Sequence, residues 1–376
     1  MSKEKQKELE KKYQFQTEYV KDITQFKQSL FNKKLIPYQV EFQAPPRGKK
    51  ICWLECPYCY GLSAEDNGER LDKDRGIKIL DEILGGGVKK IIFAGYATDP
   101  LNCSYIDDLL NLTISKKAVF GFNTKALRIS NRFYDILDQN QIVDSSYISL
   151  SIDAGSNETY NKIHAVKGSA KIYDKVLENT KKLGEIRKKN YFDLSAAYLI
   201  NIHSGNEYDC EKFINDFMNA GCNLLRFTFP QQPKGIKTDD GVVPLENEKV
   251  NYKKMIEKFK LKYENSDCSI LIVDADTDHN IYKKPRTLPC YARYVFPTVG
   301  FDGWLYNCSQ SSAPNFRSSA LGDLTKKGFW ELFYNYDLKN FEGYQKECNR
   351  RIGSSGCKCD RKEHVLNQKI IDEKII

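Results

Sequence analysis

The sequence contains no apolar run long enough to cross a membrane and no apolar segment near its start that resembles a secretory signal. A transmembrane helix needs about 20 mainly apolar residues, whereas the first 14 residues, MSKEKQKELEKKYQ, are almost all polar or charged. We therefore expect a cytoplasmic protein with no membrane partner. Internal repeats and low-complexity segments are lacking too, so a globular chain is indicated.

Histidine is scarce, with four residues in 376, and no two of them have metal-ligand spacing. A metal site built on histidine pairs is therefore not indicated, and His164 and His203, near predicted strand ends, are candidates for substrate contact. Cysteine is abundant by contrast, at twelve. Because cytoplasmic thiols are kept reduced, clustered cysteines indicate metal ligation or catalysis rather than disulfides.

The positive charge is spread along the chain. Lysine and arginine exceed aspartate and glutamate by 58 to 50, a net charge of +8, and the excess lies in segments such as 181–189 and 251–263 rather than in one arm. This distribution is typical of solvated helix faces and argues against nucleic acid as a partner. An acidic protein partner would suit the same surface.

Apolar, β-branched runs alternate with helix-like segments from about residue 48 to residue 230. This alternation predicts parallel βα units, and six units result if residues 49–54 form the first strand. Six are too few for a closed eight-stranded barrel. We predict an α/β fold with a partial (β/α)6 barrel; an open doubly wound sheet also fits the pattern. Residues 269–276 predict one more strand.

The length of the chain and its change of pattern after Pro230 predict more than one unit. We expect a helical N-terminal extension over residues 1–45 and the partial barrel over residues 46–284. A small C-terminal α+β domain is expected over residues 285–376, where five cysteines occur.

Three cysteines stand close together in the segment KKICWLECPYCYG. Cys52, Cys56 and Cys59 have the spacing C-x3-C-x2-C. Four thiolates favour zinc or an iron–sulfur cluster, and zinc sites usually come as two cysteine pairs. Here a trio stands alone, so one ligand position is left to another group.

This spacing, with the aromatic Tyr58 directly before the last cysteine, resembles the signature of radical S-adenosylmethionine enzymes. The resemblance implies a 4Fe-4S cluster on the three thiolates, with S-adenosylmethionine on the open iron and Tyr58 near its adenine. In that family an electron from the cluster cleaves S-adenosylmethionine to a 5′-deoxyadenosyl radical, which abstracts a hydrogen atom from substrate. The protein supplies positioning and excludes solvent.

Other strand ends resemble the same family. The segment GYATDP resembles the Gly-Gly-Glu-Pro segment that holds the amino group of S-adenosylmethionine: Gly95 matches a glycine and Asp99 replaces the glutamate, although the segment is longer by a residue or two. The segment FGFNTKAL resembles the end of that family's third strand, which implies that Thr124 lies at the cofactor-binding site. Ser151 and Asp153 match residues that approach the ribose or the substrate, and they share one face of a strand.

The tail resembles the SPASM and Twitch extensions, which bind auxiliary iron–sulfur clusters. The spacing from Cys290 through Gly303 to Cys308 matches the opening of these extensions, but the cysteine block that follows offers only Cys348, Cys357 and Cys359. Five thiols suffice for one auxiliary 4Fe-4S cluster and not for two. A structural zinc site is the alternative interpretation.

No catalytic residue is assigned from the sequence. Asp153 is one candidate, and Asp274 and Asp276 in the segment VDADTDH are two more, with an exposed turn as the alternative for the latter pair. Arg226 either points into the site or serves the structure. The isolated cysteines are interpreted as small buried hydrophobic residues: Cys103, Cys210, Cys222 and Cys268.

The resemblance implies a radical S-adenosylmethionine enzyme that receives electrons from flavodoxin or ferredoxin. Residues 1–45 are too short for the leader-binding domain of about 80 residues found in many peptide-modifying relatives. We therefore expect a small-molecule substrate, such as a sugar, cyclitol or amino acid derivative, with net oxidation through the auxiliary cluster as one outcome. The alternatives are a peptide- or protein-modifying enzyme, of the ribosomal peptide maturation or sulfatase-maturase type, and a zinc-stabilised nucleic-acid-binding protein.

Overall fold

The computed structural model describes residues 4, 20, 23–49, 52–59, 61, 64–95, 98–230, 244–274, 291–335 and 366. The strands are β1 (Val40–Gln43), β2 (Lys90–Ala94), β3 (Val119–Thr124), β4 (Tyr147–Ser151), β5 (Asp193–Leu199), β6 (Leu224–Thr228), β7 (Ser269–Val273), β8 (Thr298–Val299), β9 (Trp304–Tyr306) and β10 (Gly322–Asp323). The α-helices are α2 (Ile23–Phe31), α3 (Lys73–Gly85), α4 (Ile106–Ser115), α5 (Asn131–Gln139), α6 (Asn157–Ile163), α7 (Ile172–Lys189), α8 (Glu207–Asn219), α9 (Glu246–Lys262), α11 (Ala292–Val295) and α12 (Phe329–Phe333).

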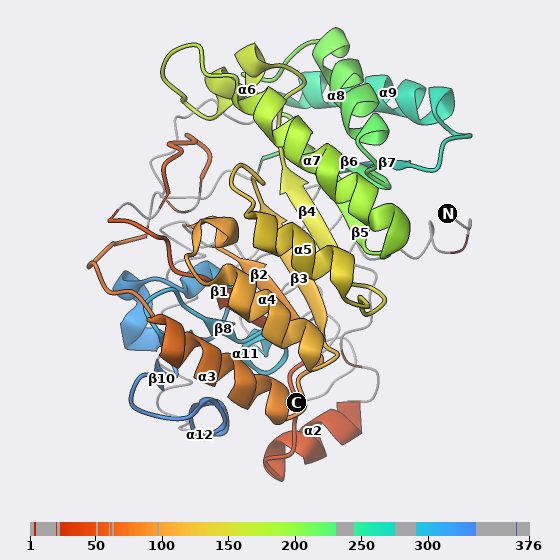
Figure 1. Ribbon diagram of the computed structural model, residues 1–376. Helices are drawn as coiled ribbons and strands as arrows, with labels where there is room; N and C mark the ends of the chain where they lie inside the picture. The colour runs from red at the N-terminus through yellow and green to blue at the C-terminus, as the bar shows by residue number, and fades with distance from the viewer. Residues whose placement is uncertain are drawn as a thin grey trace.

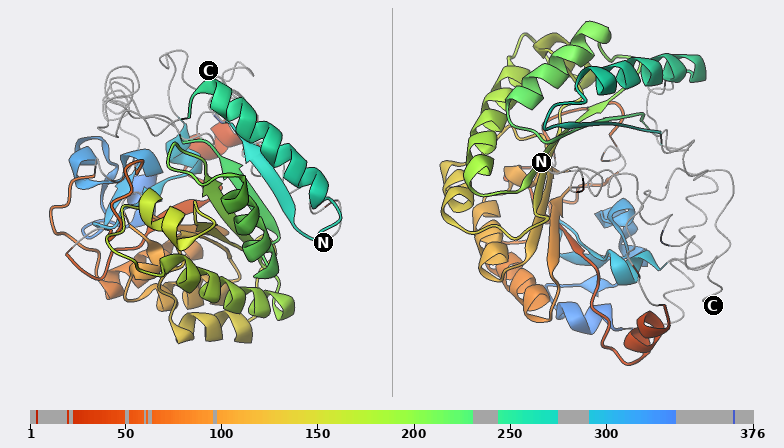
Figure 2. Two further views of the ribbon diagram at one scale, coloured as in Figure 1. Left: turned by 90° about the horizontal axis from the view of Figure 1, so that it is seen from above. Right: turned by 90° about the vertical axis from the view of Figure 1, so that its right-hand side faces the viewer.

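Among the described residues, the strands form one sheet of ten in the order β10-β9-β8-β1-β2-β3-β4-β5-β6-β7. Strands β1 to β7 pair in parallel, β8 is parallel to β1, and β9 and β10 are antiparallel to their neighbours. The helices from α3 to α8 follow one another round the outer side of the curved sheet (Figures 1 and 2). The sheet is not closed, which confirms the predicted partial barrel.

Strand β3 has large aromatic side chains on the face that packs against the helices and a glycine on the opposite face. Phe120 and Phe122 are fully buried between sheet and helices, where Phe122 stacks on Phe93 at 4.8 Å between ring centroids and meets Phe133 edge-on at 5.2 Å. The alternate position in the same strand is a glycine, Gly121. A Cβ there would overlap the Tyr147 ring on the inner face. The glycine thus leaves space on the inner face for the Tyr147 ring.

The first strand lies earlier in the chain than the sequence predicted. The prediction placed it at residues 49–54, but residues 52–59 form a loop and β1 is formed by Val40–Gln43. Here Val40 and Phe42 are fully buried and alternate with Glu41 and Gln43, the period-two pattern of a strand. The barrel sheet thus begins inside the segment that was assigned to the N-terminal extension.

The C-terminal strands continue the same sheet. Thr298 and Val299 of β8 pair with Glu41 and Phe42 of β1. The β8–β9 turn contains Gly303, whose φ of 80° lies in the left-handed region that favours glycine. Residues 298–323 are therefore joined to the barrel edge by backbone hydrogen bonds. Among the residues described here, no helix has the length and apolar character needed to span a membrane.

Replacing Phe122 by alanine should lower the free energy of unfolding by about 3–5 kcal/mol, because the ring leaves a cavity among Phe93, Phe120 and Phe133. Urea unfolding followed by circular dichroism measures the change. Phe31→Ala is the control, since that ring is 89% exposed and its loss should change stability little. Equal losses in the two variants would contradict the proposed core.

Candidate functional site

The three clustered cysteines lie on the loop between β1 and α3, at the end of the sheet where the parallel strands finish. Cys56 is 6% exposed, and Cys52 and Cys59 are half-buried. The loop is tightened by a hydrogen bond from Cys59 N to Cys56 O at 3.0 Å and by one from Gly61 N to Cys59 Sγ at 3.3 Å. In parallel sheets, reactive groups gather at this carboxyl end.

Tyr58 ties the cysteine loop to β4 and α6. Its hydroxyl donates to Asp153 Oδ2 at 2.9 Å and lies 3.0 Å from His164 Nδ1. The same nitrogen of His164 lies 3.1 Å from Cys56 Sγ. A carboxylate, an imidazole, a phenol and a thiol thus meet in one buried cluster.

Lys125 connects this cluster with Asp99. Its ammonium donates to Asp153 Oδ2 at 2.8 Å, and its backbone N–H donates to Asp99 Oδ2 at 2.7 Å. Asp99 Oδ1 accepts from the Thr124 hydroxyl at 2.7 Å and from Leu101 N at 3.0 Å. The ends of β2, β3 and β4 are therefore fixed to one another by Asp99, Thr124 and Asp153, which the sequence had assigned to cofactor binding, and by Lys125, which it had not.

The ion pair between Lys125 and Asp153 sets the ionisation of this region. Burial raises the pKa of Asp153, but the Lys125 ammonium and then His164 oppose it, so the pKa of this carboxyl lies below its usual range. The pKa of Lys125 is raised, because Asp153 outweighs the opposing effect of burial. The two side chains are 17% and 5% exposed. Both members of the pair are therefore charged near neutral pH.

His164 is neutral and its tautomer follows from its partners. Burial and then the neighbouring Lys125 charge lower the pKa of its imidazole to about 3. Its Nε2 lies 3.1 Å from the Ile152 carbonyl oxygen, an acceptor, so Nε2 carries the proton and donates. Nδ1 is left as the acceptor that faces Tyr58 and Cys56. The ring is fully buried and packs against Tyr160 at 4.2 Å between centroids.

The backbone is strained where β4 ends. Asp153 has a φ of 65°, in the left-handed region that residues other than glycine rarely adopt. Ala126, directly after Lys125, has a φ of 51°. Such strain costs about 1–3 kcal/mol at each position and persists only where the surroundings hold it, commonly at functional sites.

Gly95 is required by the turn that follows β2. A Cβ at this position would overlap Thr98, whose hydroxyl donates to the Ala44 carbonyl at 3.2 Å. The backbone therefore passes close to Thr98 only because residue 95 is glycine. Burial raises the pKa of Asp99, against the hydrogen bonds from Lys125 and Thr124. Asp99 already accepts three hydrogen bonds, so its role includes holding this turn.

Ser151 lies on the inner face of β4, next to other small or polar residues on neighbouring strands. The register pairs it with Ala197, which pairs in turn with Arg226. Ser151 and Arg226 are half-buried, and Asn123 on the same face of β3 is exposed. This row of side chains lines the interior of the open barrel below the Lys125–Asp153 pair.

The loop cysteines fit a cluster of several irons. Burial raises the pKa of the Cys56 thiol to about 12, with a further contribution from the Cys52 and Cys59 charges, so the three thiols lie within electrostatic reach of one another. In the part of the chain described here, no three His, Cys, Asp or Glu side chains surround a single ion position. Thiolates that each bind a different iron of one cluster need not converge on a single point.

Several predicted residues fall outside the described part of the chain. These are Cys290, Cys348, Cys357, Cys359 and Asp276. Cys308 is described: it is buried, and its Sγ lies 3.4 Å from the Ser311 hydroxyl. Asp274 is buried at the end of β7 and accepts from Lys253 at 2.7 Å. The exposed turn considered for it is therefore wrong at this residue.

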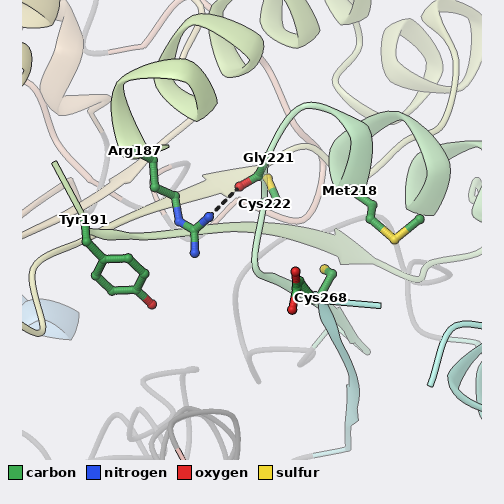
Figure 3. A pocket seen from close by; sticks show the side chains of 7 residues that line it. Arg187, Tyr191, Met218, Gly221, Cys222 and Cys268 are labelled. Carbon is green, nitrogen blue, oxygen red and sulfur yellow. Dashed lines mark hydrogen bonds between the residues drawn. The ribbon is translucent and has the colours of Figure 1, made fainter. Parts of the chain in front are cut away.

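A cavity of about 220 Å³ lies at the opposite end of the barrel (Figure 3). Its lining includes Cys222 and Cys268, which stand just before β6 and β7, and Arg187. The guanidinium of Arg187 already donates to the carbonyls of Phe192 and Gly221. This cavity lies away from the cysteine loop. The interpretation of the isolated cysteines is confirmed, since they are 0–5% exposed: Cys103, Cys210, Cys222 and Cys268.

The described residues form an open parallel α/β barrel with a three-cysteine loop at the carboxyl ends of its strands. Residues 49–219 match the family model described as the Radical SAM superfamily. No curated protein matches the chain significantly.

Solved structures of two proteins share the fold. SuiB of Streptococcus suis, bound to S-adenosylmethionine, has a TM-score of 0.61 at 14% identity over 89% of this chain and 76% of its own. The protein anSMEcpe, with bound AdoMet and the Kp18Cys peptide, has a TM-score of 0.56 at 15% identity over 90% of this chain and 100% of its own. SuiB has also been solved with its precursor peptide SuiA. At these sequence identities, the structures show that this chain shares their fold.

Two residues of the cluster were not assigned roles by the sequence. Lys125 directly follows Thr124 at the end of β3, which is the one signal that could have indicated it. His164 was considered only as a substrate contact, yet it is fully buried against the cysteine loop. The burial of His164 depends on how α6 packs on the sheet. A local sequence pattern does not predict this packing.

Lys125→Met should destabilise the protein at neutral pH by about 3–5 kcal/mol, since it leaves the Asp153 charge buried without a partner. The sign of the pH dependence follows. In the wild type the pKa of Asp153 is lowered, so its contribution is present above about pH 4. In the variant, burial alone raises this pKa and stability falls as the pH rises above about 4. The deficit should therefore grow from pH 4 to pH 7.

Urea unfolding of the metal-free chain at both pH values tests this expectation. Lys189→Met is the matched control, because its ion pair with Asp138 spans 3.0 Å but the two side chains are 69% and 38% exposed. Its effect should stay within about 0.5 kcal/mol. A deficit in Lys125→Met that is the same at pH 4 and pH 7 would contradict the assigned charges.

Proposed function

We propose that this protein reductively cleaves S-adenosylmethionine and uses the resulting radical to abstract a hydrogen atom from a substrate. The observation that carries the proposal is the three-cysteine loop at the carboxyl end of an open parallel barrel, held on the Asp153–Lys125 pair by Tyr58. When bound, the cluster supplies one electron to the sulfonium, which yields methionine and the 5′-deoxyadenosyl radical. The chain supplies the ligands, the orientation and a largely dry site.

A role is proposed for the residues at each strand end. Cys52, Cys56 and Cys59 hold the 4Fe-4S cluster, and Gly95 with Asp99 receives the amino group of S-adenosylmethionine. One acceptor position remains on Asp99 Oδ2 beside the Lys125 amide.

Ser151 and Asp153 approach the ribose or the substrate, and Thr124 orients Asp99. Asp153 is already held by three donors, which are Tyr58, Lys125 and Leu199 N at 2.9 Å. Its position is therefore fixed before any ligand arrives, and preorganisation of this kind limits the entropy lost on binding.

The tail is proposed to hold one auxiliary 4Fe-4S cluster. The thiols available for it are those named from the sequence: Cys290, Cys308, Cys348, Cys357 and Cys359. Support comes from Cys308, which is buried just after β9, whereas Gly303 lies in the turn before that strand; the spacing between the two residues resembles the SPASM and Twitch opening. The electron donor is proposed to be flavodoxin or ferredoxin, whose acidic surface would complement the positive charge.

Two substrate classes compete. The first class is a small molecule, such as a sugar, cyclitol or amino acid derivative. A peptide is favoured by a different observation: anSMEcpe was solved with a bound peptide, and this chain covers all of it. This shared fold supports a peptide as the second candidate substrate.

Replacing Cys52, Cys56 and Cys59 together by alanine should remove about half of the iron and all cleavage of S-adenosylmethionine, since one of two clusters loses its ligands. Iron and acid-labile sulfide analysis of anaerobically purified protein, with assay of 5′-deoxyadenosine, measures both. Cys103→Ala is the control, because this buried cysteine is isolated from the loop and should leave both values unchanged. Retained cleavage in the triple variant would overturn the proposal. A colourless protein with zinc and no sulfide would favour the nucleic-acid-binding alternative.

The substrate class is expected to appear as stimulation of 5′-deoxyadenosine formation. Pools of sugars, cyclitols and amino acid derivatives are compared with pools of peptides, using dithionite as the electron source. Productive hydrogen abstraction should transfer deuterium from a labelled substrate into 5′-deoxyadenosine, whereas uncoupled cleavage should not. Transfer from peptides alone would overturn the small-molecule prediction, and transfer from small molecules alone would overturn the peptide alternative.

A further inference from the structure

Asp209, in the first turn of α8, is a buried carboxylate with four side-chain hydrogen bonds. Its Oδ2 accepts from Gly155 N and from the Tyr198 hydroxyl, each at 2.8 Å. Its Oδ1 accepts from the Ser156 hydroxyl at 2.8 Å and from the Thr159 hydroxyl at 2.9 Å. A carboxylate has about four acceptor positions, so Asp209 has none left for a ligand. Asp209 can therefore affect the site only through the residues that donate hydrogen bonds to it.

These donors lie on both sides of Asp153. Gly155 and Ser156 follow it in the turn from β4 to α6. Tyr198 stands next to Leu199, whose backbone N–H donates to Asp153 Oδ1 at 2.9 Å. One carboxylate therefore fixes both the turn that contains Asp153 and the strand that holds the Asp153 side chain. Figure 1 shows α6 and α8 at the same end of the molecule.

Two glycines, Gly155 and Gly205, pack closely against Asp209. A Cβ on Gly155 would overlap the Asp209 carbonyl oxygen, and a Cβ on Gly205 would overlap the Asp209 side chain. The β4–α6 turn can approach α8 closely because residue 155 is glycine, and the segment before α8 can approach the Asp209 side chain because residue 205 is glycine. Close packing of this kind can hold the left-handed φ of Asp153, which would relax if the turn were free.

We propose that Asp209 is a positioning residue that holds the β4–α6 turn, and with it Asp153, in the geometry needed to bind S-adenosylmethionine. This inference rests on the function proposed above for Asp153. Asp209 itself touches neither cofactor nor substrate.

Asp209→Asn tests the proposal, because it keeps the shape but turns an amide NH2 toward two of the four donors. The KM for S-adenosylmethionine should rise on the order of tenfold, the loss expected for hydrogen bonds to a charged group, while kcat changes little. In a double-mutant cycle, adding Asp209→Asn to Asp153→Asn should raise the KM little further, because Asp209 acts through the Asp153 carboxylate. Additive effects would overturn the proposal.

Asp216→Asn is the matched control. Asp216 is also on α8 and accepts from a tyrosine hydroxyl, that of Tyr173 at 2.7 Å, but it lies between α7 and α8, away from the β4–α6 turn. Its substitution should leave the KM unchanged. Hydrogen–deuterium exchange gives a readout that needs no cofactor: residues 152–160 should exchange faster in Asp209→Asn and not in Asp216→Asn. Unchanged exchange would overturn the positioning role whether or not the wild type cleaves S-adenosylmethionine.

Tyr198→Phe keeps the proposal testable if Asp209→Asn fails to fold. It retains the ring, which stacks on Phe227 at 5.4 Å between centroids, and removes one of the four donors. A smaller rise in KM and faster exchange over residues 152–160 are expected. If the wild type shows no cleavage while these exchange changes appear, the proposed function fails and the positioning role stands. Cleavage with neither change in exchange nor change in KM overturns the positioning role alone.

Discussion

The buried ion pair between Lys125 and Asp153 is the interaction on which the arrangement of the site depends. Two charges that are 17% and 5% exposed are stable together only with close contact and further hydrogen bonds, and the structure supplies both. Asp153 has Tyr58 and Leu199 N as additional donors, and the backbone of Lys125 is fixed by Asp99. The cysteine loop and three strand ends are thereby joined through one pair of charges.

The fold explains why these groups meet. Parallel strands deliver their carboxyl ends to one edge, and β1 to β4 carry the cysteine loop, Asp99, Lys125 and Asp153 to that edge in chain order. The outer face of the same strands is filled by fully buried aromatic rings such as Phe93, Phe120 and Phe122, which fix the spacing of the strand ends. On the inner face, Gly121 leaves space for the Tyr147 ring, and Ser151 pairs with Ala197. The same alternation that builds the core thus places smaller side chains at these inner positions beneath the site.

Much of this arrangement could be predicted from local patterns. The alternation of apolar runs identified β2 to β7, and motif resemblance identified Asp99, Thr124 and Asp153, which the structure joins through Lys125. The first strand was misplaced because residues 51–54 are apolar and begin the cysteine motif, whereas Val40–Gln43 is only four residues long and shows its strand character through pairing with β2 and β8. The roles of Lys125, His164 and Asp209 depend on contacts between segments 28 to 108 residues apart. No spacing rule records such contacts.

The ion pair also bears on the thiols. Burial raises the pKa of Cys56, the Lys125 charge lowers it, and the Asp153 charge raises it. Under the proposed function, Cys56 would bind iron as a thiolate, so binding would displace a proton that burial retains. The Lys125 charge favours loss of this proton and the Asp153 charge opposes it. The two opposite charges nearly cancel when they are in contact. Asp153 can therefore stay ionised for its own role without opposing the loop, provided that Lys125 remains in contact with it. Both parts of the site therefore depend on this ion pair. It keeps the carboxylate at the end of β4 ionised, and it allows the neighbouring cysteine thiols to lose their protons.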